Sequence, residues 1–240
     1  MPIKNRAAIV TGASRGLGSA IAREYLRAGA RLAITARDGA ALARTADALG
    51  TYGEVFALAG DVAEPQHAQR LVAETVQRFG GIDILVNNAS ELGPSPMPPL
   101  EMLRRADYER ILAVNAVAPL HLAQLALPHL RRVHGIVINV SSDAGVNAYA
   151  GWGGYGSSKA ALEHWSAILA EEIKGQGVRV LVVDPGDMDT QMHRLAEPGA
   201  DLSHLPSPEF VAPAFVRMLD EPRSFARLEA QQLLAGAALA

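Results

Sequence analysis

Short apolar runs alternate with longer stretches of helical periodicity along nearly the whole chain. The apolar runs predict strands at 7–11, 31–36, 55–59, 82–86, 136–140, 178–183 and 225–229. The stretches between them predict helices at 16–29, 39–49, 65–79, 101–132, 156–175 and 207–219, the fourth of them kinked at Pro119. Strands that are apolar throughout belong to parallel sheets covered on both faces. The pattern therefore predicts an α/β fold with a doubly wound parallel sheet of about seven strands flanked by helices.

Composition narrows the function classes. The 240 residues are 49% hydrophobic, which is enough for one sizeable core, and we expect a single domain over 1–240. The absence of cysteine excludes disulfides and thiolate metal sites, and we expect no metal. A formal net charge of −3 gives no reason to expect nucleic acid or a membrane as partner. The chain shows no apolar signal segment at its start, so we expect a cytoplasmic protein.

A glycine-rich turn, TGASRGLG, follows the first predicted strand and opens the first predicted helix. Gly12, Gly16 and Gly18 leave room for backbone N–H groups to approach a pyrophosphate, whose charge the helix N-terminus favours. An ordinary tight turn is the alternative, but the strand before and the helix after favour a dinucleotide site. Such a site would also contact Ser14, Arg15 and Leu17.

The end of the second predicted strand favours NADP(H) over NAD(H). NAD sites usually carry an acidic residue there for the ribose 2′-hydroxyl, whereas this chain has Ala36 followed by Arg37. Arg37 and Arg15 could converge on a 2′-phosphate through charge-assisted hydrogen bonds. The alternative is that both are surface arginines and that Asp38 neutralises Arg37.

Two residues after the third predicted strand could meet the adenine. The Asp61 carboxylate could accept from the exocyclic amine while Val62 packs on the ring. An aspartate in this position is otherwise a turn or helix cap. The shared edge of the sheet favours the binding role.

Tyr155 and Lys159 are four residues apart near the start of a predicted helix, so they face the same side. An ammonium beside a tyrosine favours the phenolate, and we expect Lys159 to lower the pKa of Tyr155. Ser142 ends the fifth predicted strand, where its hydroxyl could hold a substrate oxygen beside Tyr155. Asn115 could hold a water that extends a proton route from Lys159, or it could be a buried asparagine that satisfies backbone groups.

Together these motifs resemble the short-chain dehydrogenase/reductase family. The resemblance covers about residues 3–190 and rests on these segments in the family's order: TGASRGLG, Asp61, NNAS at 87–90, Asn115, Ser142, YGSSK at 155–159 and PGDMDT at 185–190. It implies a Rossmann-type domain with a cofactor-binding part at about 1–140 and a catalytic and substrate-binding part at about 141–240. It also implies an NADP-preferring oxidoreductase with Tyr155 as acid/base.

The resemblance assigns further roles. Lys159 would lower the pKa of Tyr155 and bind the nicotinamide ribose, Ser142 would orient the substrate, and Asn115 would join a proton relay. The remaining cofactor contacts would be Asn87, Asn88, Ala89, Pro185, Gly186, Met188 and Thr190. The chain departs from the family at Ser90, where glycine is usual, and in the acidic residues Asp184 and Asp187.

The substrate stays open at this stage. Its wall is expected to include Glu91, Leu92, Asp143, Asn147, Trp152, Met188, Met192 and His193. A 3-oxoacyl-thioester and a general ketone or aldehyde both fit, and a non-catalytic NADP-binding sensor or scaffold is the alternative outside catalysis. Epimerisation or dehydration usually needs a longer substrate domain. We expect a homotetramer or homodimer through the helices at 101–132 and 156–175.

Overall fold

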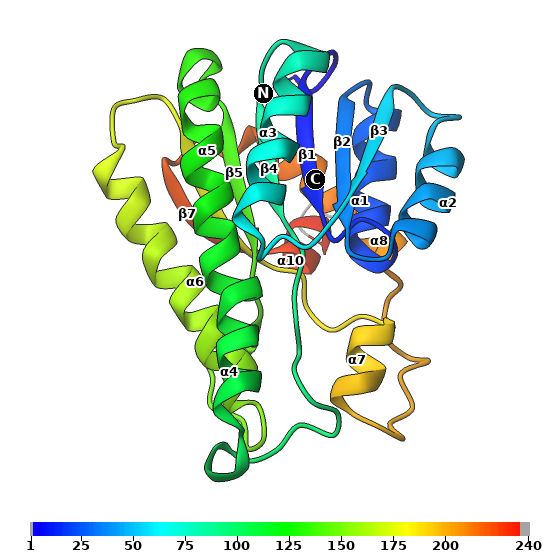
Figure 1. Ribbon diagram of the computed structural model, residues 1–240, viewed down its shortest axis with the longest axis vertical. Helices are drawn as coiled ribbons and strands as arrows, with labels where there is room; N and C mark the ends of the chain where they lie inside the picture. The colour runs from blue at the N-terminus through cyan, green and yellow to red at the C-terminus, as the bar shows by residue number, and fades with distance from the viewer. Residues whose placement is uncertain (1, 236–240) are drawn as a thin grey trace.

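The computed structural model describes residues 2–235, and its centre is one parallel sheet of seven strands in the order β3-β2-β1-β4-β5-β6-β7. The doubly wound fold is confirmed (Figure 1). The strands are β1 (Ala7–Thr11), β2 (Arg31–Ala36), β3 (Val55–Ala59), β4 (Ile84–Asn87), β5 (Ile136–Val140), β6 (Arg179–Asp184) and β7 (Phe225–Glu229). The predicted strands differ from these by no more than two residues at either end.

Helices cover both faces of the sheet. One face packs against α1 (Gly16–Arg27), α2 (Gly39–Leu49), α8 (Pro208–Val211) and α9 (Pro213–Arg217), and the other against α3 (Pro65–Phe79), α5 (Ala118–Val133) and α6 (Gly153–Glu172). Strand β1 is apolar throughout because both of its faces are buried. Ala8 and Val10 pack into the core on the α1 face of the sheet, and Ala7 and Ile9 pack into the core on the α3 face.

The long helix predicted over 101–132 is not continuous. It consists of the short 3-10 helix η1 (Leu100–Met102), then α4 (Arg105–Leu112), a π-helical turn η2 (Ala113–Val117) and α5. Proline at 119 has no N–H, so it cannot donate to the Asn115 carbonyl in the α-helical pattern. The predicted kink is therefore a widened turn that begins six residues before the proline and contains Asn115.

The helical stretch Arg105–Val133 is long and apolar enough to cross a membrane by length and composition alone. However, 56% of its most apolar window is buried inside the protein. Because this stretch packs on the sheet and on α3, its apolar character serves the core.

The C-terminal region departs most from prediction. The helix expected over 207–219 is divided into α8, α9 and the 3-10 helix η4 (Met218–Asp220), with Pro213 beginning the second piece. Two short helices were not predicted, α7 (Gln191–Ala196) and α10 (Ala230–Ala235). Figure 1 shows α7 beyond the carboxyl ends of the strands, away from the sheet. It thus lies over the sheet edge where parallel α/β proteins bind ligands.

The strand order reverses between β1 and β4, which are hydrogen-bonded neighbours. After β1 the chain turns toward β2 and β3, whereas from β4 it continues toward β5, β6 and β7. A crevice forms at such a reversal because the connecting segments diverge there. The glycine-rich turn and the Asn88 segment both follow strands that end at this point.

Candidate active site

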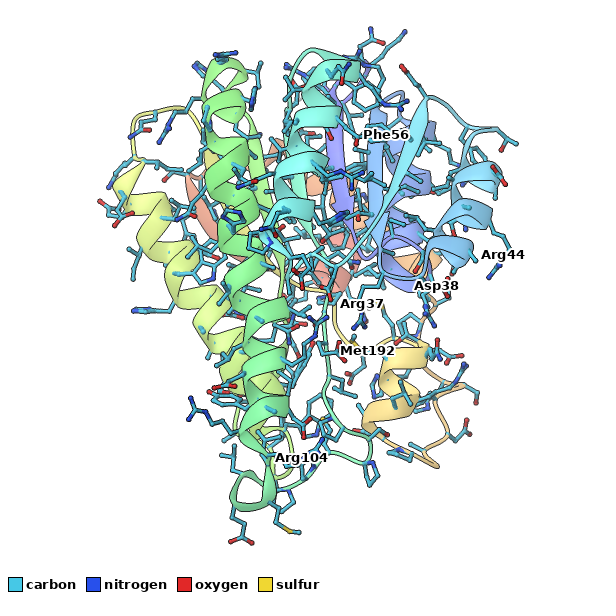
Figure 2. The ribbon with its side chains drawn as sticks, viewed as in Figure 1. Arg37, Asp38, Arg44, Phe56, Arg104 and Met192 are labelled. Carbon is cyan, nitrogen blue, oxygen red and sulfur yellow. The ribbon has the colours of Figure 1, made fainter. Side chains whose placement is uncertain are left out.

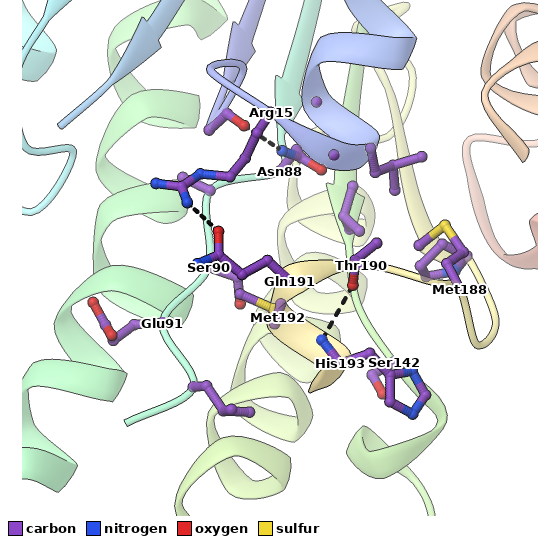
Figure 3. Close-up of a pocket in the computed structure, with 18 of the residues that line it drawn as sticks. Arg15, Asn88, Ser90, Glu91, Ser142, Met188, Thr190, Gln191, Met192 and His193 are labelled. Carbon is purple, nitrogen blue, oxygen red and sulfur yellow. Dashed lines mark hydrogen bonds between the residues drawn. The ribbon is translucent and has the colours of Figure 1, made fainter. Parts of the chain in front are cut away.

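A cavity of about 810 Å³ occupies the carboxyl edge of the sheet, between the strand ends and α7 (Figure 3). Nearly all the residues predicted for the cofactor line it. They are Gly12, Ser14, Arg15, Gly16, Leu17, Gly18, Arg37, Asp61, Val62, Asn88, Ala89, Tyr155, Lys159, Pro185, Gly186, Met188 and Thr190. Asn87 does not line the cavity. Its side chain instead donates to Asn139 and to the Pro119 carbonyl, at 2.8 and 3.2 Å, which anchors β4 to β5 and α5.

The three glycines of the turn fit a bound pyrophosphate. Gly12 and Gly16 have positive φ values, +67° and +55°. A Cβ on Gly12 or Gly18 would collide with backbone atoms within 2.8 Å, so these two allow close packing. A Cβ on Gly16 would meet nothing within 4 Å, because this residue faces the open cavity. The turn therefore presents bare backbone to the space where a phosphate group would approach the N-terminus of α1.

The floor of the cavity is held by hydrogen bonds between β1 and the segment after β4. Thr11 Oγ1 accepts from the N–H groups of Asn88 and Ala89, at 3.0 and 2.9 Å. The Asn88 side chain donates in return to the Thr11 carbonyl at 2.8 Å. These bonds fix the two crossing segments that any dinucleotide would contact.

The two arginines line the same cavity but contact different partners. Arg15 hydrogen-bonds to Gln191 of α7, while Arg37 Nη1 lies 2.9 Å from Glu91 Oε2. Figure 2 labels Arg37 and Asp38, which both line the cavity, between the strand ends and α7. Asp38 does not neutralise Arg37, because its carboxylate accepts from the Ala41 N–H and caps α2. Each guanidinium of the expected pair thus has its own neighbour: Arg15 contacts a neutral amide, and Arg37 contacts a carboxylate.

Asp61 lies in the cavity with a partner that the sequence did not reveal. Its Oδ2 accepts from Arg110 at 2.6 Å and its Oδ1 from the Ala63 N–H at 2.9 Å. Burial acts to raise the pKa of Asp61, but these two hydrogen bonds, together with the positive charges of Arg110 and Arg37, outweigh it and lower the pKa. Arg110 was missed because it is one of several arginines in a polar helical stretch, and only the fold brings it to Asp61.

Tyr155 and Lys159 lie in the first two turns of α6 and are both buried. Lys159 Nζ donates to the Val140 carbonyl at 2.8 Å and lies 5.4 Å from the centroid of the Tyr155 ring. Burial lowers the pKa of Lys159 to about 8, although the negative charge of Glu163 acts in the opposite direction. The lysine is therefore a cation whose charge is held with little margin at neutral pH.

The expected lowering of the Tyr155 pKa by Lys159 is wrong. Burial raises the pKa of Tyr155 to about 12, and the carboxylates of Asp184 and Asp143 act in the same direction. The hydroxyls of Ser90 and Ser142 hydrogen-bond to the tyrosine and oppose this rise. Tyr155 is consequently a protonated phenol at neutral pH, which suits donation of a proton.

Asn115 is buried and does not line the cavity. Its amide accepts from the Glu91 N–H at 2.7 Å and from Ser90 Oγ at 3.2 Å, and it donates to the Glu91 carbonyl and to Ser158 Oγ. These four bonds use the hydrogen-bonding capacity of the side chain. The Asn115 side chain therefore matches the alternative of a buried asparagine that satisfies neighbouring polar groups. A water in a proton relay would have to bind the Asn115 backbone instead.

The predicted substrate wall is only partly assembled. Leu92, Asp143, Trp152, Met188, Met192 and His193 line the cavity. Trp152 packs edge-on against Tyr155, with ring centroids 5.9 Å apart. Glu91 also lines it, but its carboxylate lies 2.9 and 3.9 Å from Arg37 and Arg110 and so faces the cofactor side. Asn147 is exposed and lies outside the cavity lining.

A charged network beneath the catalytic loop was not predicted. Glu163 lies one turn after Lys159 and accepts from Ser141 Oγ at 2.6 Å. Arg227 of β7 donates to Glu163 at 3.0 Å and to the Ser142 carbonyl at 3.4 Å, and it lies 3.5 Å from Asp184 Oδ2. The i, i+4 spacing of Lys159 and Glu163 was the available signal, but Arg227 is remote in sequence.

Comparisons with known proteins agree with this site. Residues 6–200 match the family model for short chain dehydrogenases. The rhamnolipids biosynthesis 3-oxoacyl-[acyl-carrier-protein] reductase of Pseudomonas aeruginosa is 39% identical over 202 residues, which cover 80% of this chain and 76% of the relative.

Solved structures show the same relationship. A short chain dehydrogenase from Pseudomonas syringae superposes with a TM-score of 0.88 at 32% identity, covering 95% of this chain and 96% of the other. A short chain dehydrogenase from Shigella flexneri 2a strain 301, complexed with NADP, gives 0.86 at 28% identity, covering 96% and 98%. With the cavity, the glycine turn and the Tyr155–Lys159 pair in place, the chain belongs to the short-chain dehydrogenase family of oxidoreductases.

Proposed function

We propose that this protein reduces a carbonyl group to an alcohol with NADPH and catalyses the reverse oxidation with NADP⁺. The observation that carries the proposal is the cavity itself, because one cavity is lined both by Gly16 of the glycine turn and by Ser142 and Tyr155. The cofactor's nicotinamide supplies or accepts the hydride when bound. Lys159, which lines the same cavity, would hold the nicotinamide ribose.

The chain's own residues handle the oxygen. The Ser142 hydroxyl orients the carbonyl oxygen, and the Tyr155 phenol donates its proton to that oxygen as negative charge develops there. A phenol with a pKa of about 12 is fully protonated before reaction. Burial of Tyr155 and Lys159 also keeps bulk water from the reacting atoms, which strengthens their electrostatic effect.

NADP(H) is favoured over NAD(H) by the groups near the end of β2. Ala36 offers no carboxylate to a ribose 2′-hydroxyl, and Arg37 and Arg15 line the same cavity. The related Shigella flexneri structure was solved with NADP. A dinucleotide that carries a 2′-phosphate would compete with Glu91 and Gln191 for the two arginines.

Two substrate classes remain for the proposal. One is a 3-oxoacyl thioester, by similarity to the Pseudomonas aeruginosa reductase. The other is a small ketone or aldehyde. The test is an oxidation screen with NADPH and NADH over acyl thioesters, sugars, steroids, quinones and small ketones, with Tyr155→Phe as the inactive control. Binding of NADPH without turnover of any carbonyl would overturn the proposal in favour of a sensor or scaffold, and a tenfold preference for NADH would overturn the choice of cofactor.

A homodimer or homotetramer through the helical pair fits the surface of the protein. Val117 and Ile168, from the turn η2 and from α6, are apolar side chains with 62% and 46% exposure. Association of two copies through the helices at 101–132 and 156–175 would cover both exposed side chains. Light scattering coupled to size exclusion tests this, and a monomer at micromolar concentration would contradict it.

A further inference from the structure

Asp143 follows Ser142 directly and shares a hydrogen bond with it. Ser142 Oγ lies 3.0 Å from Asp143 Oδ1, and the serine donates because an ionised carboxylate can only accept. Both side chains line the cavity beside Tyr155. A substrate oxygen held by Ser142 and Tyr155 would therefore lie one hydrogen bond away from a carboxylate.

The spacing suits two heteroatoms on adjacent carbon atoms. If the reacting oxygen accepts from Ser142, an oxygen or nitrogen on the neighbouring carbon falls within reach of Asp143 Oδ1. A donor there would satisfy Asp143 in place of the serine proton. Ser142 could then turn its proton to the carbonyl oxygen, where it is needed. An acceptor or an anion at the same place would face an unscreened carboxylate.

The charge of Asp143 is not neutralised by the protein. Among residues 2–235, no lysine, arginine or histidine forms an ion pair with it; its side-chain partners are Ser142 and the Tyr149 hydroxyl, which donates to Oδ2 at 2.7 Å. By contrast, Asp184 lies beside Arg227. Two of the four lone-pair positions of the Asp143 carboxylate therefore remain for a ligand.

Aromatic contacts hold the carboxylate in place. Tyr149 packs edge-on against Trp152, and Trp152 against Tyr155, with ring centroids 6.3 and 5.9 Å apart. The hydroxyl that fixes Asp143 thus belongs to the same stack as the catalytic tyrosine. Such a supported side chain loses little conformational entropy when it binds a ligand.

We propose that Asp143 selects substrates that carry a hydrogen-bond donor, a hydroxyl or an ammonium group, on the carbon next to the reacting carbonyl. The substrates are α-hydroxy or α-amino ketones and aldehydes, and the products are vicinal diols or amino alcohols. The carbonyl carbon gains the hydride of the reduced nicotinamide and its oxygen gains the Tyr155 proton, while the neighbouring C–O or C–N bond stays intact. The inference rests on the function proposed above.

The test compares three ketones of matched size, hydroxyacetone, aminoacetone and 2-butanone, by NADPH oxidation. A hydrogen bond to a charged acceptor predicts a kcat/KM about tenfold or more above that of 2-butanone for a donor-bearing ketone. Asp143→Ala should reduce this advantage, measured as the ratio of the two kcat/KM values within the variant, to less than about threefold. The ratio is the readout because loss of Asp143 also frees the Ser142 proton and can change the 2-butanone value itself. Asp143→Asn keeps a hydrogen-bond acceptor but removes the charge. If the wild-type advantage of hydroxyacetone is kept in this variant, the ligand of Asp143 is a hydroxyl group. If a wild-type advantage of aminoacetone is lost in this variant, the ligand is an ammonium group.

Asp187→Asn is the matched control, because it removes a carboxylate from the same cavity without a contact to Ser142. It should keep the preference. Equal kcat/KM values for all three ketones in the wild type, or an equal loss of preference in Asp187→Asn, would overturn the role of Asp143. Failure of every carbonyl in the broader screen would instead overturn the proposed function, so the two failures are distinguishable.

Discussion

Arg227 donates from Nε to both carboxylate oxygens of Glu163, at 3.0 and 3.3 Å. This contact joins the last strand of the sheet to the helix that carries Lys159. Glu163 in turn favours the ammonium form of Lys159, whose pKa burial lowers to about 8. The edge strand β7 therefore supports the charge at the active site, although none of its residues is expected to touch substrate.

Replacing Glu163 by Gln should move the alkaline limit of activity to lower pH. Removal of the negative charge lowers the pKa of Lys159 further, so the ammonium is lost earlier as pH rises. We expect a shift of about 0.5 to 1 unit in the alkaline limb of kcat/KM. Glu171→Gln, on the exposed part of the same helix beside Lys174, is the control. Superimposable profiles for Glu163→Gln and the wild type would contradict the coupling.

Tyr155→Phe should retain cofactor binding and lose turnover by at least about 10²–10⁴-fold, because the proton donor is removed while the ring remains. Binding is measured by NADPH fluorescence and turnover by NADPH oxidation. The phenyl ring can still pack against Trp152, so a folding defect is not expected. Turnover near that of the wild type would show that another group supplies the proton.

Lys159→Met should stabilise the protein while it abolishes activity. The folded-state pKa of Lys159, about 8, lies below the ordinary lysine value of 10.5, so between these pH values the unfolded chain binds more protons. Stability from this group is therefore lowest below pH 8 and rises toward pH 10.5. We expect Lys159→Met to raise the free energy of unfolding by about 2 kcal/mol at pH 7 and by less at pH 10. Urea unfolding at both pH values measures this, and equal gains would contradict burial of the charge.

Ser90→Ala should raise the pKa of Tyr155, because the contact with the Ser90 hydroxyl lowers that pKa. To stabilise the phenolate, Ser90 turns its single proton from Asn115 to Tyr155. In the direction of alcohol oxidation, where Tyr155 acts as a base, the rising limb of the pH profile should move up by about 0.3 to 1 unit. Ser157→Ala is a suitable control, since that exposed hydroxyl hydrogen-bonds to Tyr108 and to the Gly154 carbonyl. An unchanged rising limb of the pH profile in Ser90→Ala would show that Ser90 does not influence the pKa of Tyr155.

Arg37→Ala and Glu91→Gln should act in opposite directions on the cofactor. Loss of Arg37 should raise KM for NADPH about tenfold and change KM for NADH little, because the role proposed for the guanidinium is recognition of the 2′-phosphate alone. Glu91→Gln should lower KM for NADPH, since it releases Arg37 from an acidic competitor. Parallel changes with both cofactors would place the effect elsewhere in the cavity.

The strands and the cofactor turn could be predicted because their signals are local. An apolar run bounded by turn residues forms a strand wherever both faces are covered, and the glycines of TGASRGLG serve the turn in which they lie. Tyr155 and Lys159 share a helix face by spacing alone. The prediction of one continuous helix over 101–132 was wrong. The π-helical turn around Asn115 depends on contacts to Glu91 and Ser158 as well as on Pro119, and those contacts come from distant parts of the chain.

By itself, the sequence determined the order of the seven strands and the glycine turn between the first strand and the first helix, because each depends on neighbours within a few positions. Only the tertiary structure decided which charges meet. It turned Glu91 toward Arg37, brought Arg110 to Asp61 and Arg227 to Glu163, and buried Tyr155 deeply enough to raise its pKa instead of lowering it. Electrostatic energies depend on distance and desolvation, and both are properties of the packed fold and not of sequence spacing.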